Sequence, residues 1–366
     1  MDTIPFFDLK RQYANLKGEL APAIESVLEK TAFSGGEFTD RFEKEFADYC
    51  GIRHMLGVNS GTAAIHFALL ALGIGPGDEV IVPAHTFIAS ASGISYAGAK
   101  PVFVDSLPDT WEIDPNAVAK AITKKTRAVI VVHLYGVPCE LDELKRIAND
   151  HKLSLIEDCA QAHGALYKSR NVGSIGEVSA FSFYPSKNLG AYGEAGAVGT
   201  DNEKIAKLIE MLRSHGGKEK YSHKMLGYNE RMDGIQGAVL SVKLRHLDTW
   251  NKRKAMIAKK YFEGIDNPLI TLQHIPKEVT PAHHLFVVLV DDRPKFIKYL
   301  KARGVGSAVH YPIPCHLQEA YRTLGYTRGD LPKAEHIADE CVSLPLFPEL
   351  TDKEVETVID VANGYV

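Results

Sequence analysis

A lysine on a glycine-rich loop and an acidic strand end carry the clearest chemistry in this sequence. Lys187 lies in the run Ser182-Phe-Tyr-Pro-Ser-Lys-Asn-Leu-Gly, downstream of an apolar segment that ends at Asp158. An amine that loses its proton in a partly desolvated pocket can form a Schiff base with an aldehyde, and a buried carboxylate can hold a protonated pyridine nitrogen. Together the two side chains predict the covalent and electrostatic anchors of pyridoxal 5'-phosphate.

The carboxylate has a simpler interpretation too. Asp158 ends an apolar run, where a carboxylate must be paired or it takes up a proton. A ring N–H would be such a partner, but an aspartate at this point could equally cap a following helix. The position of Lys187 on a glycine-rich loop between two predicted strands favours the cofactor interpretation.

Two further segments could complete such a site. Ser60-Gly61-Thr62 opens a predicted helix, so its N–H groups and the Thr62 hydroxyl could hold a phosphate at the positive end of the helix dipole. The alternative is a plain N-cap. Phe87 or His85, just after a predicted strand, could cover a planar ring, although an aromatic residue there is more often packing.

Other motifs exclude competing chemistry. The segment Gly73-Ile-Gly-Pro-Gly-Asp78 follows a helix and precedes a strand, which is the reverse of a dinucleotide fingerprint. The pair His283 and His284 lacks the spacing of metal ligands, so we expect no metal. No G-x-S-x-G elbow is present, which leaves nucleophilic hydrolysis unsupported.

The elements that must position these residues alternate between strand and helix from about residue 50 to 200. This alternation predicts an α/β fold with a mainly parallel central sheet flanked by helices, and ligands of such sheets lie at the carboxyl ends of the strands. Expected strands are 79–83, 101–105, 126–133, 154–158, 178–183 and 197–200, and expected helices are 62–72, 88–96, 115–121 and 141–151.

After residue 201 the pattern changes. We expect a helix to residue 214, a polar loop at 215–229, and one long helical stretch at about 233–265. A strand at 285–290 with helices at 293–302 and 353–362 predicts a smaller C-terminal α+β domain. The expected division is residues 1–248 for a large cofactor-binding domain with an N-terminal segment, and 249–366 for the small domain.

Composition excludes several partners. A net charge of -4 over 366 residues gives no attraction to nucleic acid. No apolar run approaches the roughly 20 residues of a membrane span. The five cysteines are scattered and odd in number, which is typical of reduced thiols. We therefore expect a cytoplasmic protein without nucleic-acid or membrane partners.

Taken in order, these motifs resemble the DegT/DnrJ/StrS family of pyridoxal-phosphate sugar aminotransferases, which have fold type I. The resemblance covers nearly the whole chain. It is carried by Phe33-Ser-Gly-Gly, Phe42-Glu-Lys-Glu-Phe, Ser60-Gly-Thr-Ala, Gly77-Asp-Glu-Val-Ile-Val-Pro, Glu157-Asp-Cys-Ala-Gln-Ala-His-Gly, Ser182-Phe-Tyr-Pro-Ser-Lys, Asn229-Glu-Arg-Met-Asp and His310-Tyr-Pro-Ile-Pro.

The resemblance implies a role for each site residue. Lys187 would bond to the cofactor, Asp158 would pair with the pyridine nitrogen, and Gln161 would bind the ring hydroxyl. The phosphate would be held by Gly61, Thr62 and Ser182, with Phe87 over one ring face. The family forms homodimers with shared sites, so Asn229 would reach the phosphate in the neighbouring subunit. Candidates for holding the donor carboxylate or the sugar are Tyr184, Arg231, His310, Tyr311 and His316.

The family also implies the reaction. L-Glutamate would give its amino group to the cofactor, leaving pyridoxamine 5'-phosphate as the intermediate form, and a nucleotide-linked keto sugar would then receive it. The loop from Phe183 to Tyr192 is similar to that of enzymes acting at C3, which favours a dTDP-3-keto-6-deoxyhexose. A C4 aminotransferase, an enzyme for a UDP-3-keto-glucuronic acid and a pyridoxal-phosphate-binding regulator without turnover remain the alternatives.

Overall fold

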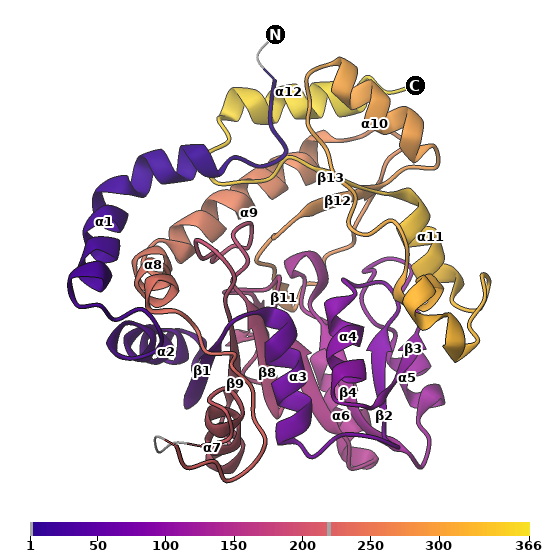
Figure 1. Cartoon of the computed structure of the whole chain (residues 1–366). Helices are drawn as coiled ribbons and strands as arrows, with labels where there is room; N and C mark the ends of the chain where they lie inside the picture. Colours follow the sequence, from indigo (N-terminus) through magenta and orange to yellow (C-terminus); the bar gives the residue numbers. More distant parts are fainter. Residues whose placement is uncertain (1–2, 218–220) are drawn as a thin grey trace.

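A seven-stranded sheet forms the centre of the protein (Figure 1). The computed structural model describes residues 3–217 and 221–366, so part of the loop predicted at 215–229 lies outside the described residues. Neighbouring strands are parallel except where β9 meets β8 and β1, which confirms a mainly parallel sheet. The spatial order is β1 (His54–Val58), β9 (Gly196–Thr200), β8 (Val178–Ser182), β5 (Ser154–Asp158), β4 (Thr126–Val132), β2 (Glu79–Pro83) and β3 (Lys100–Val104).

Helices cover both faces of this sheet, and alternate strand residues divide between two cores. Val80 and Val82 face one core, whereas Ile81 between them faces the other. This burial on both sides explains why the strands read as continuous apolar runs. The first face carries α3 (Gly61–Ala71), α4 (Ala89–Tyr96) and α7 (Glu203–Leu212), and the second carries α2 (Glu37–Cys50), α5 (Pro115–Ala121) and α6 (Leu141–Asp150).

The helical stretch predicted at about 233–265 consists of two helices. The chain forms α8 (Gly234–Leu244) and α9 (Leu247–Gly264) with a break between them. The two helices pack against different elements. Helix α8 contacts α1 (Leu9–Glu29) and α2, whereas α9 contacts α12 (Asp352–Asn363). At the break, Arg245 and His246 both turn to Glu19 of α1, at 3.2 and 2.9 Å.

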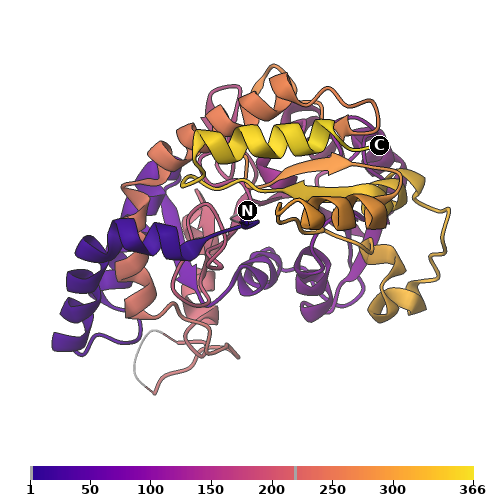
Figure 2. The ribbon, with the colours of Figure 1, turned by 90° about the horizontal axis from the view of Figure 1, so that it is seen from above.

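The C-terminal part is built on a small antiparallel sheet. Strand β12 (Phe286–Leu289) pairs with β10 (Thr271–Leu272) and with β13 (Cys341–Leu344). Figure 2 shows α10 (Arg293–Ala302) and α12 running beside these strands. Residue Ile4, from the opposite end of the sequence, belongs to the same core. The sequence prediction missed β13 and the helix before it, α11 (Pro332–Glu340).

Short elements complete the fold. A second small sheet joins β11 (Val279–Thr280), β6 (Leu166–Tyr167) and β7 (Arg170–Asn171), and short 3-10 helices lie at Leu134–Gly136, Cys315–Leu317 and Glu319–Leu324. No helix within the described part of the chain has both the length and the apolar character needed to cross a bilayer.

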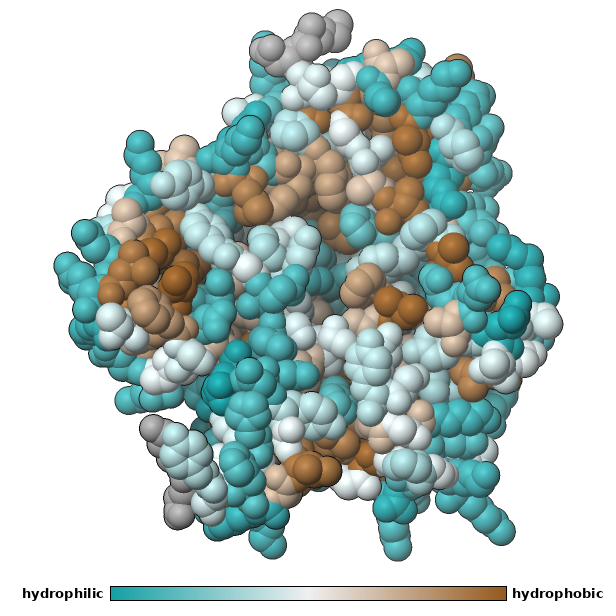
Figure 3. All heavy atoms as spheres, viewed as in Figure 1, coloured by the Kyte–Doolittle hydropathy of each residue, from teal (hydrophilic) through white to brown (hydrophobic). Residues whose placement is uncertain are grey.

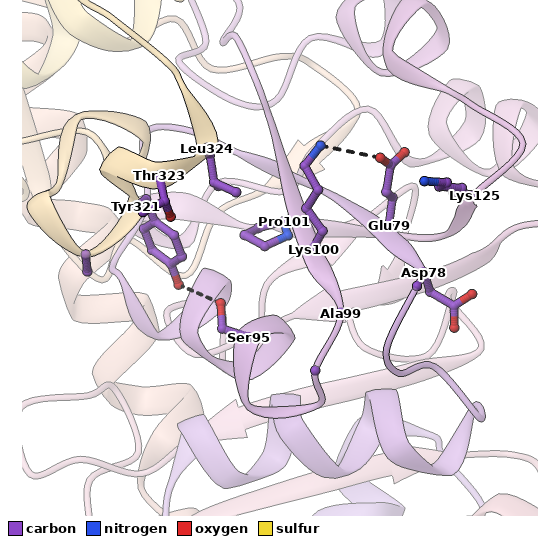
Figure 4. Close-up of a pocket in the computed structure, with 13 residues that line it drawn as sticks. Asp78, Glu79, Ser95, Ala99, Lys100, Pro101, Lys125, Tyr321, Thr323 and Leu324 are labelled. Atoms are coloured by element: carbon purple, nitrogen blue, oxygen red, sulfur yellow. Dashed lines mark hydrogen bonds and ion pairs between the residues drawn. The ribbon is translucent and has the colours of Figure 1, made fainter.

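The 3-10 segments near residue 320 fasten the C-terminal part to the central sheet. Figure 4 shows Tyr321 beside Ser95 of α4, with 3.3 Å between their hydroxyl oxygens, at the edge of a surface pocket of about 440 Å³. The Cys315 N–H donates to the Ala84 carbonyl at 2.7 Å. These contacts hold the segment that follows His310 and Tyr311 close to the ends of the strands.

Candidate active site

A cavity of about 500 Å³ lies at the carboxyl ends of the central strands. Its walls come from the start of α3, the segment after β2, the end of β5, the loop between β8 and β9, and two C-terminal segments. The lining residues are Ser60, Gly61, Thr62, Ile65, Thr86, Phe87, Ala89, Ser90, Val132, Asp158, Ala160, Gln161, Ser182, Tyr184, Ser186, Lys187, Glu194, His284, His310 and Tyr311.

Asp158 is the last residue of β5 and is almost fully buried in the wall of this cavity. One carboxylate oxygen accepts from the Ser90 hydroxyl at 2.8 Å, and the other accepts from the Ala160 N–H at 3.1 Å. Burial raises the pKa of this carboxyl, while those two donors and the charge of Lys187 act in the opposite direction. The carboxylate is thus fixed in place and retains room for one more donor.

Lys187 lies on the loop that links β8 to β9. Its N–H donates to the Tyr184 carbonyl at 2.8 Å, which closes a turn and directs the side chain into the cavity. Burial lowers the pKa of its amine to about 8, and the charge of Asp158 opposes that shift. Among the described residues, none accepts a hydrogen bond from Nζ or pairs with it. The amine is therefore available for chemistry.

The start of α3 forms the opposite wall. Ser60 caps the helix by accepting from the Ala63 N–H at 3.1 Å, and the N–H groups of Gly61 and Thr62 precede the first intrahelical bond. A Cβ atom on Gly61 would lie 2.6 Å from Ser182 Cβ, so only glycine permits this approach of the helix to β8. The N–H groups of Gly61 and Thr62 and the hydroxyls of Thr62 and Ser182 therefore border one part of the cavity. Donors of this kind at the start of a helix are what an anion site requires.

Gln161 and Phe87 border the space between these groups. The Gln161 side chain accepts from the Tyr135 N–H at 2.6 Å and donates to the Tyr311 hydroxyl at 3.0 Å. Phe87 is half exposed and lies 5.3 Å from the Tyr311 ring. An aromatic ring, an amide and a phenol thus border the cavity together.

The five candidate substrate residues divide into two groups. Tyr184, His310 and Tyr311 line the cavity, with burial lowering the pKa of His310 to about 4. His316 does not line it, because its Nε2 lies 3.1 Å from a Glu335 oxygen in the interior. Arg231 is also outside the lining and donates to Asn229 at 2.7 Å, next to the end of β1. Neither Asn229 nor Arg231 therefore lines the cavity of its own chain.

A model of the DegT/DnrJ/EryC1/StrS aminotransferase family matches residues 15–362. The chain belongs to this family. Two relatives named as sugar transaminases match almost its full length. The chain is 46% identical to the dTDP-3-amino-3,4,6-trideoxy-alpha-D-glucose transaminase of Streptomyces venezuelae, over 99% of this chain and 96% of that protein. It is 43% identical to the dTDP-3-amino-3,6-dideoxy-alpha-D-galactopyranose transaminase of Aneurinibacillus thermoaerophilus, over 99% of each.

A solved structure gives the same result. The X-ray crystal structure of S. venezuelae DesV in complex with a ketimine intermediate superposes with a TM-score of 0.97 at 45% identity, covering 99% of this chain and 98% of that one. The fold type I expectation is therefore confirmed, and the family identifies the protein as a sugar aminotransferase.

Sequence reasoning missed several residues in the wall of this family site. Ser90 binds Asp158 but lies on α4, and only the tertiary contact between α4 and β5 reveals it. His284 was considered only as half of a histidine pair, yet it lines the cavity. Glu194 also lines it, on the same glycine-rich loop as Lys187. Its position on that loop was the one available signal.

One buried cluster has the composition of a metal site but a different construction. Polar atoms of His133, Glu157 and Cys159 all lie within 4.8 Å of one another. The Glu157 carboxylate, however, already accepts from His133 and from the N–H groups at 173, 175 and 176. Burial also raises the pKa of the Cys159 thiol. The cluster is a hydrogen-bonded support beneath Asp158, because its oxygens are committed to protein donors.

Proposed function

We propose that this protein is a pyridoxal 5'-phosphate-dependent aminotransferase that transfers the amino group of L-glutamate to a nucleotide-linked keto sugar. The observation that carries the proposal is the pairing, in one cavity, of an unbonded lysine amine with a buried, fixed carboxylate. Membership of a sugar aminotransferase family gives that pairing its chemical meaning.

The residues present fit this cofactor. Close contact between Gly61 and Ser182 leaves a cradle that a single Cβ would fill, with N–H and hydroxyl donors for a phosphate. At the other end, Asp158 would hold the pyridine nitrogen and Gln161 the ring hydroxyl. Phe87 would cover one face of the ring. Asn229 would act on the phosphate of the neighbouring subunit.

The cofactor, when bound, supplies an aldehyde for Lys187 and a ring that withdraws electrons. The protein's own contribution is proton transfer and orientation. With a pKa of about 8, the Lys187 amine can give up its proton near neutral pH and then serve as the base that removes a proton from the donor Cα. Asp158, held by Ser90 and Ala160, would keep the ring nitrogen protonated.

For the substrate we propose a dTDP-3-keto-6-deoxyhexose, aminated at C3. Support comes from the two related transaminases, whose names both specify a 3-amino deoxy sugar linked to dTDP. The competing substrates are a C4 keto sugar and a UDP-3-keto-glucuronic acid. Incubation with each keto sugar nucleotide and L-glutamate, followed by mass analysis of the amine, distinguishes them.

We also propose a homodimer with shared sites. Of the described residues that line the cavity, Lys187 is the only lysine or arginine, although a phosphate and two donor carboxylates require cations. Arg231 and Asn229 do not line that cavity and are hydrogen-bonded to each other, which supports a role for them in the site of the neighbouring subunit. Figure 3 shows an apolar patch over α1 and α8, and Tyr13 and Leu28 of α1 are half exposed, as an unfilled interface would be.

A cytoplasmic location agrees with the thiol chemistry. The five cysteines, Cys50, Cys139, Cys159, Cys315 and Cys341, are free and buried. Reduced thiols of this kind are typical of the cytosol.

The deciding experiment traps the lysine. Purified protein is loaded with pyridoxal 5'-phosphate, reduced with borohydride, digested and mapped by mass spectrometry. We expect the label on Lys187 and none on a Lys187→Met variant. Addition of L-glutamate before reduction should remove the label, because the amino group has moved to the cofactor. Labelling of Lys187 that glutamate leaves unchanged would instead support a cofactor-binding regulator, and labelling elsewhere would refute the site.

A further inference from the structure

The side chain after the candidate lysine is the centre of a buried hydrogen-bond network. Asn188 Nδ2 donates to the Ala282 carbonyl at 2.7 Å and to Asn251 Oδ1 at 2.9 Å. Its Oδ1 faces Lys254 Nζ at 2.9 Å and His284 Nδ1 at 3.2 Å. All four hydrogen-bonding positions of the amide are used, and they join the Lys187 loop to α9 and to the segment before β12.

The hydrogen-bond partners of Asn188 determine the orientation of its amide and the protonated nitrogen of His284. A backbone carbonyl can only accept, so the Ala282 oxygen must face the NH₂ group of Asn188. Lys254 also donates to the His284 carbonyl, at 3.1 Å, and its amine, charged or neutral, has a further proton to donate to the Asn188 oxygen. An oxygen that only accepts requires a proton on His284 Nδ1.

His284 also has a second ring nitrogen. His284 lines the cavity, its Nδ1 faces Asn188, and no described residue is bonded to its Nε2. We infer that His284 is a specificity-determining residue whose Nε2 lone pair accepts a hydrogen bond from a hydroxyl of the sugar substrate, with Asn188 and Lys254 as the positioning residues that fix this tautomer. The role toward the sugar rests on the proposed function, whereas the tautomer does not.

Its surroundings keep this imidazole uncharged. Burial is the main factor that lowers the pKa of His284, and the neighbouring positive charges of Lys187 and Lys254 act in the same direction. The other titratable groups facing it, His310 and His163, also lower it. A neutral ring with Nδ1 protonated presents a pure acceptor at Nε2.

A pure acceptor distinguishes the two substrates. A sugar offers O–H donors, which satisfy the lone pair. L-Glutamate offers, apart from its reacting amine, only carboxylate oxygens, which a lone pair repels. A hydroxyl bonded to a buried acceptor is also selected strongly against analogues that lack it, because the acceptor is then left unpaired. His284 therefore contributes to recognition of the sugar and not of the amino donor.

Two substitutions of His284 distinguish the contribution of Nδ1 from that of Nε2. His284→Asn places an amide where Nδ1 lies, so it retains the bond to Asn188 but removes the acceptor. His284→Gln extends to the position of Nε2 and can restore the acceptor. We measure dissociation constants for a dTDP-linked 6-deoxyhexose and for dTDP alone. The Asn variant should bind the sugar nucleotide about 3- to 15-fold more weakly and dTDP unchanged, and the Gln variant should stay within about threefold of the native protein.

The same variants are tested with L-glutamate alone. The rate at which L-glutamate converts the bound pyridoxal 5'-phosphate to pyridoxamine 5'-phosphate should change by less than about twofold in His284→Asn. Equal losses for the sugar nucleotide, dTDP and glutamate in both variants would show a merely structural histidine and overturn the inference. A native protein that fails to convert with glutamate would refute the proposed aminotransferase function, while the sugar nucleotide binding would still test His284.

The tautomer has a direct readout that requires no activity. Nitrogen-15 NMR of histidine-labelled protein distinguishes the two ring nitrogens, and the signals missing from the Gln variant identify His284. We expect protonated Nδ1 and unprotonated Nε2 across neutral pH. The opposite tautomer, or a charged ring, would contradict the network.

Discussion

Two buried lysines show how partners, and not burial alone, decide what an amine can do. Burial lowers the pKa of Lys187 to about 8 and that of Lys254 to about 7. Lys254 donates to Asn188 and to the His284 carbonyl, whereas Lys187 has no bonded partner among the described residues. The first amine is therefore part of the framework, and the second is available to react.

The buried amine of Lys254 makes stability depend on pH. In the folded chain it loses its proton near pH 7, but in the unfolded chain it keeps it until about pH 10.4. Between these values the unfolded state binds more protons, so stability rises with pH. Relative to Lys254→Met, the native protein should gain up to about 1.4 kcal/mol per pH unit above pH 7, and nothing below it.

Urea unfolding at pH 6 and pH 9 measures this difference. Lys259→Met on the exposed side of α9 is the matched control, since within the described part of the chain its side chain pairs with Glu263 alone, at the surface. A difference between native protein and Lys254→Met that is the same at both pH values would contradict the burial argument.

At the scale of elements, the approach of α3 to β8 builds the proposed phosphate cradle. Gly61→Ala would place a Cβ 2.6 Å from Ser182 Cβ, so helix and strand must separate. We expect a loss of about 1–3 kcal/mol in stability and at least tenfold weaker cofactor binding. Thermal unfolding and titration with pyridoxal 5'-phosphate test both.

Gly18→Ala provides the control for that substitution. Gly18 lies inside α1, and an added Cβ there would meet no atom within 4 Å beyond the neighbouring backbone of its own helix. Alanine there should stabilise the protein by about 0.5–1 kcal/mol and leave cofactor binding unchanged. Cofactor binding by Gly61→Ala equal to that of Gly18→Ala would show that the cradle has no role.

The sequence predicted those elements whose signals are local. Strands 79–83 and 154–158 were found at their observed limits, because apolar runs between turns are typical of buried parallel strands. Lys187 and Asp158 stood out by residue type, and the structure brings them to one cavity. The break at 245–246 has no local helix-breaking residue, and its contacts are with Glu19, more than two hundred residues away, which a sequence pattern does not reveal. Ser90 and His284 were missed for the same reason.

At the scale of the whole molecule, charge balance argues for a second copy. The substrates carry phosphates and carboxylates, yet the cavity of one chain offers Lys187 together with the carboxylates of Asp158 and Glu194. Buried anions need charged or multiple donors. Arg231 does not line its own cavity and is bonded to Asn229, which agrees with its proposed role in a neighbouring site.

Mixing two defective variants tests this arrangement. Lys187→Met lacks the amine, and Arg231→Met lacks the cation and should lose roughly 10- to 100-fold in activity, as expected for a charged hydrogen bond. After subunit exchange at equal concentrations, half of the dimers contain both chains, and each of these has one site with neither defect. Activity should therefore rise to roughly a quarter of the native value. If Arg231 served its own chain, the mixed dimers would carry a defect in both sites, and the activity would not exceed that of the Arg231→Met subunits alone.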